Sequence, residues 1–300
     1  MTYNPKKSTK SSRTGSGRPA SVPKISAYEA KQEALLMIRR GLITPSSKLY
    51  QVIALLGTAG VLTQEQLLEL GNISKRTLGR YRQRGILDIV PMPRTINELL
   101  KAKRIWALGP IGVQLSKIQL ELVPTGYLEG QIDNISHDVL CNNVYVEVLR
   151  AAASFGYTAI LKSRYEASIK DFRNSQILQP DAMIILHHET TGEEKTFVVE
   201  YHNENYGSRA AEKIKKYEHV YREGYWQDQW NLEVFPSILI VTTHRAPAIG
   251  YRKDITLRQK GVGVKCTYLI KPLRTFLDDS QSPLVWLDLD KNKTVNLLNL

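Results

Sequence analysis

Hydrophobic and polar positions follow two different periods along the chain. Between residues 46 and 87, apolar side chains recur every three or four positions, which is the period of helices that bury one face. The pattern predicts helices over 46–60, 62–70 and 74–87, with a further short helix over 26–41. Thr63 and Gln66 form a capping-box pair, and Ser74 is a natural N-cap, so the second and third helices have defined starts.

After the third helix the pattern changes to short apolar runs. Residues 86–92 and 104–110 predict two strands around a basic loop, residues 93–103. Three helices followed by a two-stranded hairpin predict a winged helix-turn-helix.

The second half of the chain predicts a different architecture. A helix is expected over 136–156, from a Ser136 cap to Gly156, followed by strands over 157–167, 181–188 and 195–203. A helix over 208–226 and a nearly continuous apolar strand over 237–243 come next, and such a strand belongs in the centre of a sheet. This order predicts an α/β domain with a mixed sheet. We therefore expect an arm at 1–24, a winged-helix domain at 25–118, a linker at 119–133 and a second domain at 134–300.

The charge of the chain is unevenly distributed. Of the net charge of +12, the first 104 residues supply 19 Lys and Arg against 6 Asp and Glu, and the remainder is almost neutral. This asymmetry favours a polyanion-binding module joined to a nearly neutral one, with nucleic acid as the first candidate. Residues 1–24 are rich in Ser, Gly, Pro and Lys and predict a disordered basic arm, which either follows DNA phosphates or serves as a solubilising tail.

The third predicted helix carries the clearest DNA-binding signal. Arg76, Arg80 and Arg84 repeat every four residues and line one face, and no acidic residue occurs between Leu70 and Asp88. Like charges at this spacing repel, so a purely structural helix would usually include glutamate. The residues that we expect to contact double-stranded DNA are Lys75, Arg76, Thr77, Arg80 and Arg84.

Composition excludes several other classes. Cys141 and Cys266 are too few for a disulfide framework or a zinc site. No apolar run approaches the roughly 20 residues that span a bilayer. We therefore expect a cytoplasmic protein without a membrane partner.

Acidic residues stand at matching ends of two predicted neighbouring strands. Asp181 opens one strand directly after Pro180, and Glu200 closes the next. The pair is either a solvated rim or a divalent-metal site. Glu147 falls on the buried stripe of its own helix, where a carboxylate needs a partner, so we expect either a salt bridge or a contribution to that metal site.

A helical acid, a Pro-Asp pair opening a strand and an acid ending the next strand resemble the PD-(D/E)xK nuclease core. The matching positions are Glu147, Pro180-Asp181 and Glu200. With a winged helix ahead of them, the segments "HDVLCNNVYVEVLRAA", "QPDAMIIL", "FVVEYHNEN" and "KIKKYEHVY" resemble the replication-relaxation family over about residues 46–245. That family is associated with plasmids and mobile elements and is similar to the C-class mobilisation relaxases. The resemblance implies a restriction-endonuclease-like mixed sheet and Mg²⁺ or Mn²⁺ held by Asp181 and Glu200.

One position departs from the nuclease pattern, which has Lys two residues after the second acid. Here His202 occupies that position. In such sites the Lys orients a water and stabilises developing negative charge, and a histidine supplies less charge at neutral pH. Either His202 positions the water, or the Lys has moved to the following helix as Lys213 or Lys216, or only the fold remains. The candidate catalytic set is Glu147, Asp181, Glu200, His202 and Lys213.

Two functions from different classes remain open. The first is DNA processing in a plasmid, phage or integrated element, with metal-dependent nicking as its enzymatic form. The second is a non-catalytic DNA-binding regulator, or a replication or partition accessory, with a degenerate nuclease fold. Double-stranded DNA is the expected partner in both. Other replication or mobilisation proteins and a second copy of the chain are further candidate partners.

Overall fold

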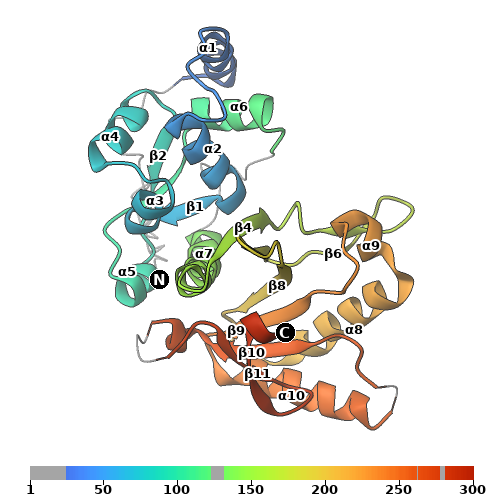
Figure 1. The fold of residues 1–300 in the computed structure, drawn as a ribbon. Helices are drawn as coiled ribbons and strands as arrows, with labels where there is room; N and C mark the ends of the chain where they lie inside the picture. Colours follow the sequence, from blue (N-terminus) through green and yellow to red (C-terminus); the bar gives the residue numbers. More distant parts are fainter. Residues whose placement is uncertain (1–24, 123–131, 262, 278–280) are drawn as a thin grey trace, which may run out of the picture.

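The computed structural model describes residues 25–122, 132–261, 263–277 and 281–300. The predicted arm at 1–24 and most of the predicted linker lie outside the described residues. The N-terminal unit contains helices around a small antiparallel sheet of order β1-β3-β2 (Figure 1). Its elements are α1 (Ala27–Arg39), α2 (Lys48–Ala59), β1 (Val61–Thr63), α3 (Gln64–Leu70), α4 (Lys75–Gln83), β2 (Leu87–Val90), α5 (Arg94–Leu100), β3 (Ile105–Leu108) and α6 (Pro110–Gln119).

The predicted starts of α3 and α4 are confirmed. The Thr63 hydroxyl accepts the Gln66 N–H at 3.2 Å, and the Gln66 side chain accepts the Thr63 N–H at 2.9 Å. The Ser74 hydroxyl accepts the Thr77 N–H at 3.2 Å. These contacts satisfy first-turn N–H groups that have no partner within the helix. After α4, Gly85 has a φ of +71°, the left-handed conformation that favours glycine where a helix ends.

The segment between β2 and β3 differs from the prediction, because the expected basic loop contains the helix α5. Ile96 is fully buried and Leu100 packs beside the same apolar cluster, and α5 contacts the helix α7 described below. The burial of its apolar residues therefore makes this segment a packed helix, although its composition is basic. The two predicted strands, β2 and β3, are present and paired, and β1 adds a third strand that pairs with β3.

The C-terminal part is built on a seven-stranded mixed sheet of order β12-β11-β10-β9-β8-β7-β4. The β8, β9 and β10 strands run parallel, and the other neighbours are antiparallel. The predicted strand at 237–243, β9, is confirmed as the central strand. The elements are α7 (Ile132–Ala153), β4 (Tyr157–Ser163), β5 (Ile169–Lys170), β6 (Gln176–Leu178), β7 (Ala182–His188), β8 (Glu194–His202), α8 (Ser208–Glu223), α9 (Tyr225–Trp230), β9 (Ser237–Thr242), α10 (Arg245–Gln259), β10 (Tyr268–Pro272), β11 (Val285–Asp288) and β12 (Lys293–Asn296).

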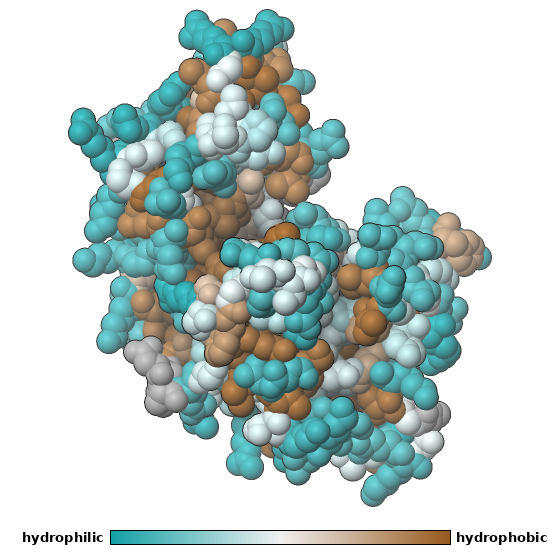
Figure 2. Space-filling model, in the orientation of Figure 1, coloured by the Kyte–Doolittle hydropathy of each residue, from teal (hydrophilic) through white to brown (hydrophobic). Residues whose placement is uncertain are grey.

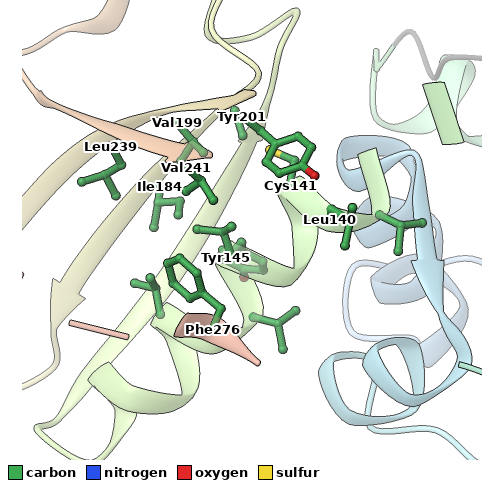
Figure 3. Close-up of a cluster of buried hydrophobic side chains, with 14 of the residues drawn as sticks. Leu140, Cys141, Tyr145, Ile184, Val199, Tyr201, Leu239, Val241 and Phe276 are labelled. Atoms are coloured by element: carbon green, nitrogen blue, oxygen red, sulfur yellow. The ribbon is translucent and has the colours of Figure 1, made fainter. Parts of the chain in front are cut away.

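The helix α7 lies between the small sheet and the large one (Figure 1). Its buried side chains Cys141 and Tyr145 face strand residues such as Ile184 and Val199 of the large sheet, whereas Leu140 points toward the N-terminal unit (Figure 3). The same apolar cluster includes residues of β1, β3 and α5. A second cluster covers the opposite face of the large sheet, where α8 and α10 pack. Both faces of α7 are therefore buried.

Contacts between α7 and the N-terminal unit are also polar. The Asn142 side chain donates to the carbonyls of Ala59 and Val61 at 2.8 and 2.7 Å. The Gln66 side chain donates to Asn143 Oδ1 at 3.2 Å. These bonds satisfy buried polar groups where α7 meets the small sheet.

The helix α7 begins at Ile132, so Ser136 lies inside it and is not the predicted cap. The expected order of helix, three strands, helix and strand is present as α7, β4, β7, β8, α8 and β9, with the β5–β6 hairpin and α9 inserted. The predicted mixed α/β architecture with a large mixed sheet is therefore confirmed. None of the helices in the described part of the chain is long and apolar enough to cross a membrane.

Candidate functional site

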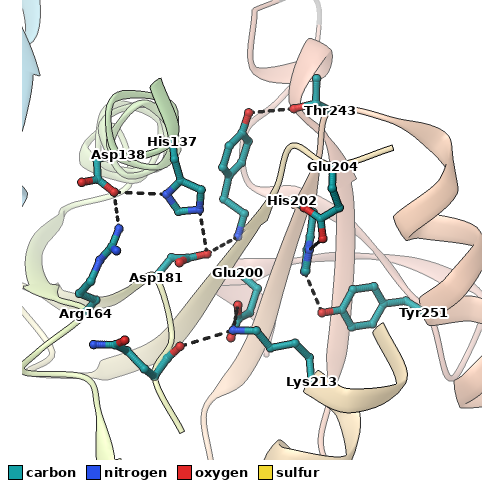
Figure 4. Close-up of polar contacts among 12 residues, drawn as sticks. His137, Asp138, Arg164, Asp181, Glu200, His202, Glu204, Lys213, Thr243 and Tyr251 are labelled. Carbon is teal, nitrogen blue, oxygen red and sulfur yellow. Dashed lines mark hydrogen bonds and ion pairs between the residues drawn. The ribbon is translucent and has the colours of Figure 1, made fainter. Parts of the chain in front are cut away.

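Asp181 and Glu200 meet where β7 begins and β8 ends. Ala182 pairs with Val199, and the Asp181 N–H donates to the Val199 carbonyl at 3.0 Å, so the register places Asp181 beside Glu200. Asp181 Oδ2 accepts the Tyr201 N–H at 2.8 Å. Figure 4 shows Asp181 between His137 of α7 and Glu200 of β8. The structure thus brings together the two acids that the sequence singled out.

Lys213 of α8 reaches the same place. Its ammonium group lies 2.6 Å from Glu200 Oε2 and donates to the Gln179 carbonyl at 3.4 Å (Figure 4). The other Glu200 oxygen accepts the Tyr217 hydroxyl at 2.6 Å. Lys213 and Tyr217 are four residues apart on α8, so one helix face delivers both donors. Of the two lysines considered from the sequence, Lys213 is the one at Glu200, and Lys216 pairs with Glu212 on the helix surface.

His202 is occupied elsewhere. Its Nδ1 lies 2.8 Å from Glu204, and its Nε2 lies 2.9 Å from the Tyr251 hydroxyl of α10 (Figure 4). Its side chain is only 5% exposed. The histidine at the expected lysine position is therefore held in a buried pair of contacts that does not include Asp181 or Glu200.

Of the two partners expected for Glu147, a salt bridge or the metal site, the structure shows the salt bridge, so Glu147 does not belong with Asp181 and Glu200 as the candidate catalytic set had it. Glu147 pairs with Arg150 at 2.6 Å, and Arg150 also binds Glu69 of α3. Glu147 lies ten residues beyond His137 on α7, which is roughly 15 Å along a helix at about 1.5 Å per residue. The partner of this carboxylate is thus Arg150, which also joins it to the N-terminal unit through Glu69.

Three residues that sequence reasoning missed complete the surroundings of Asp181. His137 Nε2 lies 3.5 Å from Asp181 Oδ2, and its Nδ1 lies 3.2 Å from Asp138, which also binds Arg164 of the segment after β4 (Figure 4). The only signal in the sequence was a His-Asp pair near the start of a helix whose start was misplaced. We call His137, Asp138, Arg164, Asp181, Glu200 and Lys213 the sheet-end cluster.

The sheet-end cluster is electrostatically balanced, with three carboxylates and three basic groups. Burial by itself would lower the pKa of His137, but the carboxylates of Asp181 and Asp138 raise it to about 10. Burial would raise the pKa of Asp181, but His137 and Lys213 hold it well below its usual range. His137 is therefore a cation at neutral pH, and its charge is matched by Asp181.

Glu200 responds differently from Asp181. Its side chain is 1% exposed, and burial, with a smaller contribution from Asp181, raises its pKa although Lys213 and Tyr217 act in the opposite direction. Burial would lower the pKa of Lys213, but Glu200 and Asp181 raise it. The Lys213–Glu200 contact is thus a largely buried ion pair in which each partner supports the charge of the other.

The arrangement of these side chains does not fit a resident metal ion. Asp181 Oδ2 and both oxygens of Glu200 are engaged by protein donors. Within the described ranges, no group of three or more His, Cys, Asp or Glu is placed to hold a metal. A cavity of about 30 Å³ lies beside Asp181 and Asp138 between α2 and β4, enough for about one water. A cation could enter this arrangement only if the protein donors moved.

The residues predicted to contact DNA occupy α4 and its end. Lys75, Arg76, Arg80 and Arg84 are exposed, and none of them has an ion-pair partner among the described residues. Thr77 is half-buried, and its hydroxyl lies 3.0 Å from the Ser74 hydroxyl within the helix cap. Hydrophilic side chains gather over this outer edge of the N-terminal unit (Figure 2). We call Arg76, Arg80 and Arg84 the α4 arginine row.

Comparison with known proteins identifies the family. The profile described as Replication-relaxation matches residues 53–236, which is more than half of the chain. Among solved structures, the restriction endonuclease FokI matches with 14% identity over 77% of this chain and 42% of its own length. The TM-score of 0.26 is too low to establish a shared fold. A comparison with curated proteins found no match. The chain belongs to the replication-relaxation family, and this membership points to a role in the replication or processing of mobile-element DNA.

Proposed function

We propose that this member of the replication-relaxation family binds double-stranded DNA through α4, as the recognition helix of a winged helix-turn-helix. The order α2, β1, α3, α4, β2, β3 and the small antiparallel sheet support a winged-helix domain, with α5 inserted in the wing. The DNA would belong to a plasmid, phage or integrated element, in keeping with the family.

The α4 arginine row carries this proposal. Three exposed guanidinium groups lie at four-residue spacing without an acidic neighbour on the helix, which leaves their charge available to an external anion. Arginine binds phosphate oxygens and guanine edges with two parallel hydrogen bonds, so the row matches the major groove and its flanking phosphates. The surplus of basic residues in the first 104 positions supports the same partner.

Binding of a fluorescent duplex at several salt concentrations tests the proposal. We expect Arg76→Ala/Arg80→Ala to lower the affinity at least about tenfold and to make the dependence on salt shallower, by about 0.9 per lost phosphate contact. Arg39→Ala/Arg40→Ala is the matched control, because it removes the same charge from the exposed end of α1. Equal affinity losses in the two double variants would show that the loss comes from the lower net charge alone, and would refute the assignment of α4 as the recognition helix.

DNA nicking with Mg²⁺ or Mn²⁺ is a second candidate function. One observation favours it, which is the placement of Asp181, Glu200 and Lys213, two acids and a lysine, at one sheet end. The protein donors on both acids oppose it. The alternative is a non-catalytic regulator or replication accessory in which the sheet-end cluster only stabilises the fold.

A supercoiled plasmid distinguishes these alternatives. If the site nicks DNA, wild-type protein with Mg²⁺ or Mn²⁺ converts the plasmid to its relaxed form, Asp181→Ala abolishes the conversion, and either cation raises the melting temperature of the wild type alone. If the cations change neither the plasmid nor the melting temperature, the non-catalytic function stands.

A further inference from the structure

A second cationic feature of α4 lies on the side of the helix that faces the small sheet. A cavity of about 590 Å³ is lined by eight residues: Gln64, Lys75, Gly79, Arg82, Gln83, Lys103, Arg104 and Trp106. The lining contains four basic side chains and no carboxylate. Cavities of this size accommodate small-molecule ligands.

Two hydrogen-bond donors of this α4 pocket lack acceptors. Arg82 Nε and Nη2 are buried and make no hydrogen bond to the described residues. The indole N–H of Trp106, a side chain only 2% exposed, is also buried without an acceptor. Buried donors without partners are unfavourable, and a charged donor is the most unfavourable of them. Two residues that line the pocket, Arg82 of α4 and Trp106 of β3, therefore carry unsatisfied donors.

The frame of the pocket is held by backbone contacts. The Gln64 N–H at the start of α3 donates to the Arg104 carbonyl at 2.9 Å. Trp106 is paired in the centre of the small sheet, opposite Leu62 on one side and Ile89 on the other. Exposed Lys103 and Arg104 follow the helix α5 and stand at the rim. The donors are thus mounted on elements that the fold fixes in place.

We propose that the α4 pocket binds a phosphate group, which accepts from Arg82 and the Trp106 indole inside the pocket and from Lys75, Lys103 and Arg104 at its rim. A phosphate has several acceptor oxygens and carries the negative charge that four basic side chains require. Its source is either the backbone of bound DNA or a free nucleotide.

The pocket is separate from the α4 arginine row. At about 100° per residue, Arg82 lies roughly 200° around the helix axis from Arg80, and Lys75 lies on the same side as Arg82. Arg82 and Lys75 of the pocket therefore lie on a different side of α4 from the row, with the pocket residues Gly79 and Gln83 between them. Loss of DNA binding by the row would not remove the phosphate site, so the two proposals fail independently.

Indole NMR signals provide a direct readout, because Trp106 is one of only four tryptophans. In protein labelled with ¹⁵N-tryptophan, inorganic phosphate is titrated against chloride at constant ionic strength, and the Trp106 signal is assigned with Trp106→Phe. We expect phosphate to shift the Trp106 signal in a saturable way and chloride to leave it in place. A Trp106 signal that responds equally to both ions would overturn the proposal, since the donors would then be satisfied by water.

Two variants test the site by different means. Arg82→Gln removes the guanidinium group with its two unsatisfied donors, and we expect a loss of phosphate affinity of at least about tenfold, as for one charge-assisted hydrogen bond. Gly79→Leu adds bulk where a Cβ meets no atom within 4 Å, and leucine is the better helix former, so the variant should fold and exclude phosphate. Gly79→Ala is its control and should keep the phosphate response. Unchanged phosphate affinity in both Arg82→Gln and Gly79→Leu would contradict the assignment.

The same signal identifies the source of the phosphate. Adenosine triphosphate and a short DNA duplex are added separately to phosphate-free protein, and the one that shifts the Trp106 signal at the lower concentration is the source. Arg76→Ala/Arg80→Ala must retain the response to inorganic phosphate, because no residue of the row lines the pocket. Loss of that response in the double variant would contradict a separate pocket.

Discussion

The basic side chains of α4 and those of the sheet-end cluster are arranged in opposite ways. Arg76, Arg80 and Arg84 point to solvent without an ion-pair partner among the described residues. Lys213 and His137 each lie against a carboxylate, and Glu200 is 1% exposed. One group carries charge that the protein leaves uncompensated, and the other carries charge that the protein compensates by itself.

This difference separates a binding surface from a stabilised interior. Repulsion between the arginines of the row lowers the stability of the helix. Their charges become favourable only when an external anion binds to them. The sheet-end cluster already has its counter-charges, and removing one of them would leave a buried ion unpaired. Variants of the row should therefore weaken DNA binding without lowering the stability of the fold. Variants of the cluster should lower the stability of the fold without weakening DNA binding.

The largest expected effect is at Lys213. Lys213→Met leaves the buried Glu200 without its cation, which should lower the free energy of unfolding by about 3–5 kcal/mol. Lys216→Met is the matched control, because Lys216 is on the same helix and pairs with an exposed glutamate. Urea titrations of both variants measure the difference. If Lys213→Met were no more destabilising than Lys216→Met, the cluster would not be a buried, self-compensated site.

A smaller effect is expected from pH at His137. Because its pKa rises from 6.5 to about 10 in the fold, its stabilisation is complete below pH 6.5 and is lost as the pH rises toward 10. The melting temperature of the wild type should exceed that of His137→Gln at pH 6.5, and the gap should narrow steadily up to pH 10. A gap that stays constant over this range would show that His137 carries no charge in the folded protein.

The smallest effect concerns the basic arm, which sharpens the comparison from the binding side. Deleting residues 1–24 removes six Lys and Arg and no acid. If the arm contacts phosphates, the slope of log K against log salt becomes shallower by up to about 0.9 per lost contact. If the arm is a solubilising tail, the deletion leaves the slope unchanged and lowers only solubility.

Local sequence signals predicted a large part of the fold. The caps at Thr63 and Ser74 were readable because a helix start needs a few residue types at fixed spacing. The apolar run at 237–243 placed the central strand for a similar reason. The helix α5 and the start of α7 were missed, since packing between distant segments decides them and no short pattern records it.

The candidate site was predictable in part. Asp181 and Glu200 were predicted because they stand at matching ends of two neighbouring strands. Lys213 was one of two candidate lysines, because the helix that follows a strand can place a side chain beside the end of that strand. Glu147 was included in the candidate catalytic set because its angle around the helix shows that it is directed inward. That angle does not show which residues of neighbouring elements lie at its height along the helix axis. His137 and Arg82 were not singled out, because the importance of His137 comes from its partners in the folded protein and that of Arg82 from its lack of hydrogen-bond acceptors there.

Hydrogen–deuterium exchange with and without a DNA duplex tests most directly which of the two charged regions meets DNA. The α4 account predicts slower exchange over residues 75–86 when the duplex is present and unchanged exchange over residues 181–202. Protection of residues 181–202 with no change over 75–86 would contradict it, because the DNA would then lie at the sheet-end cluster and not on α4.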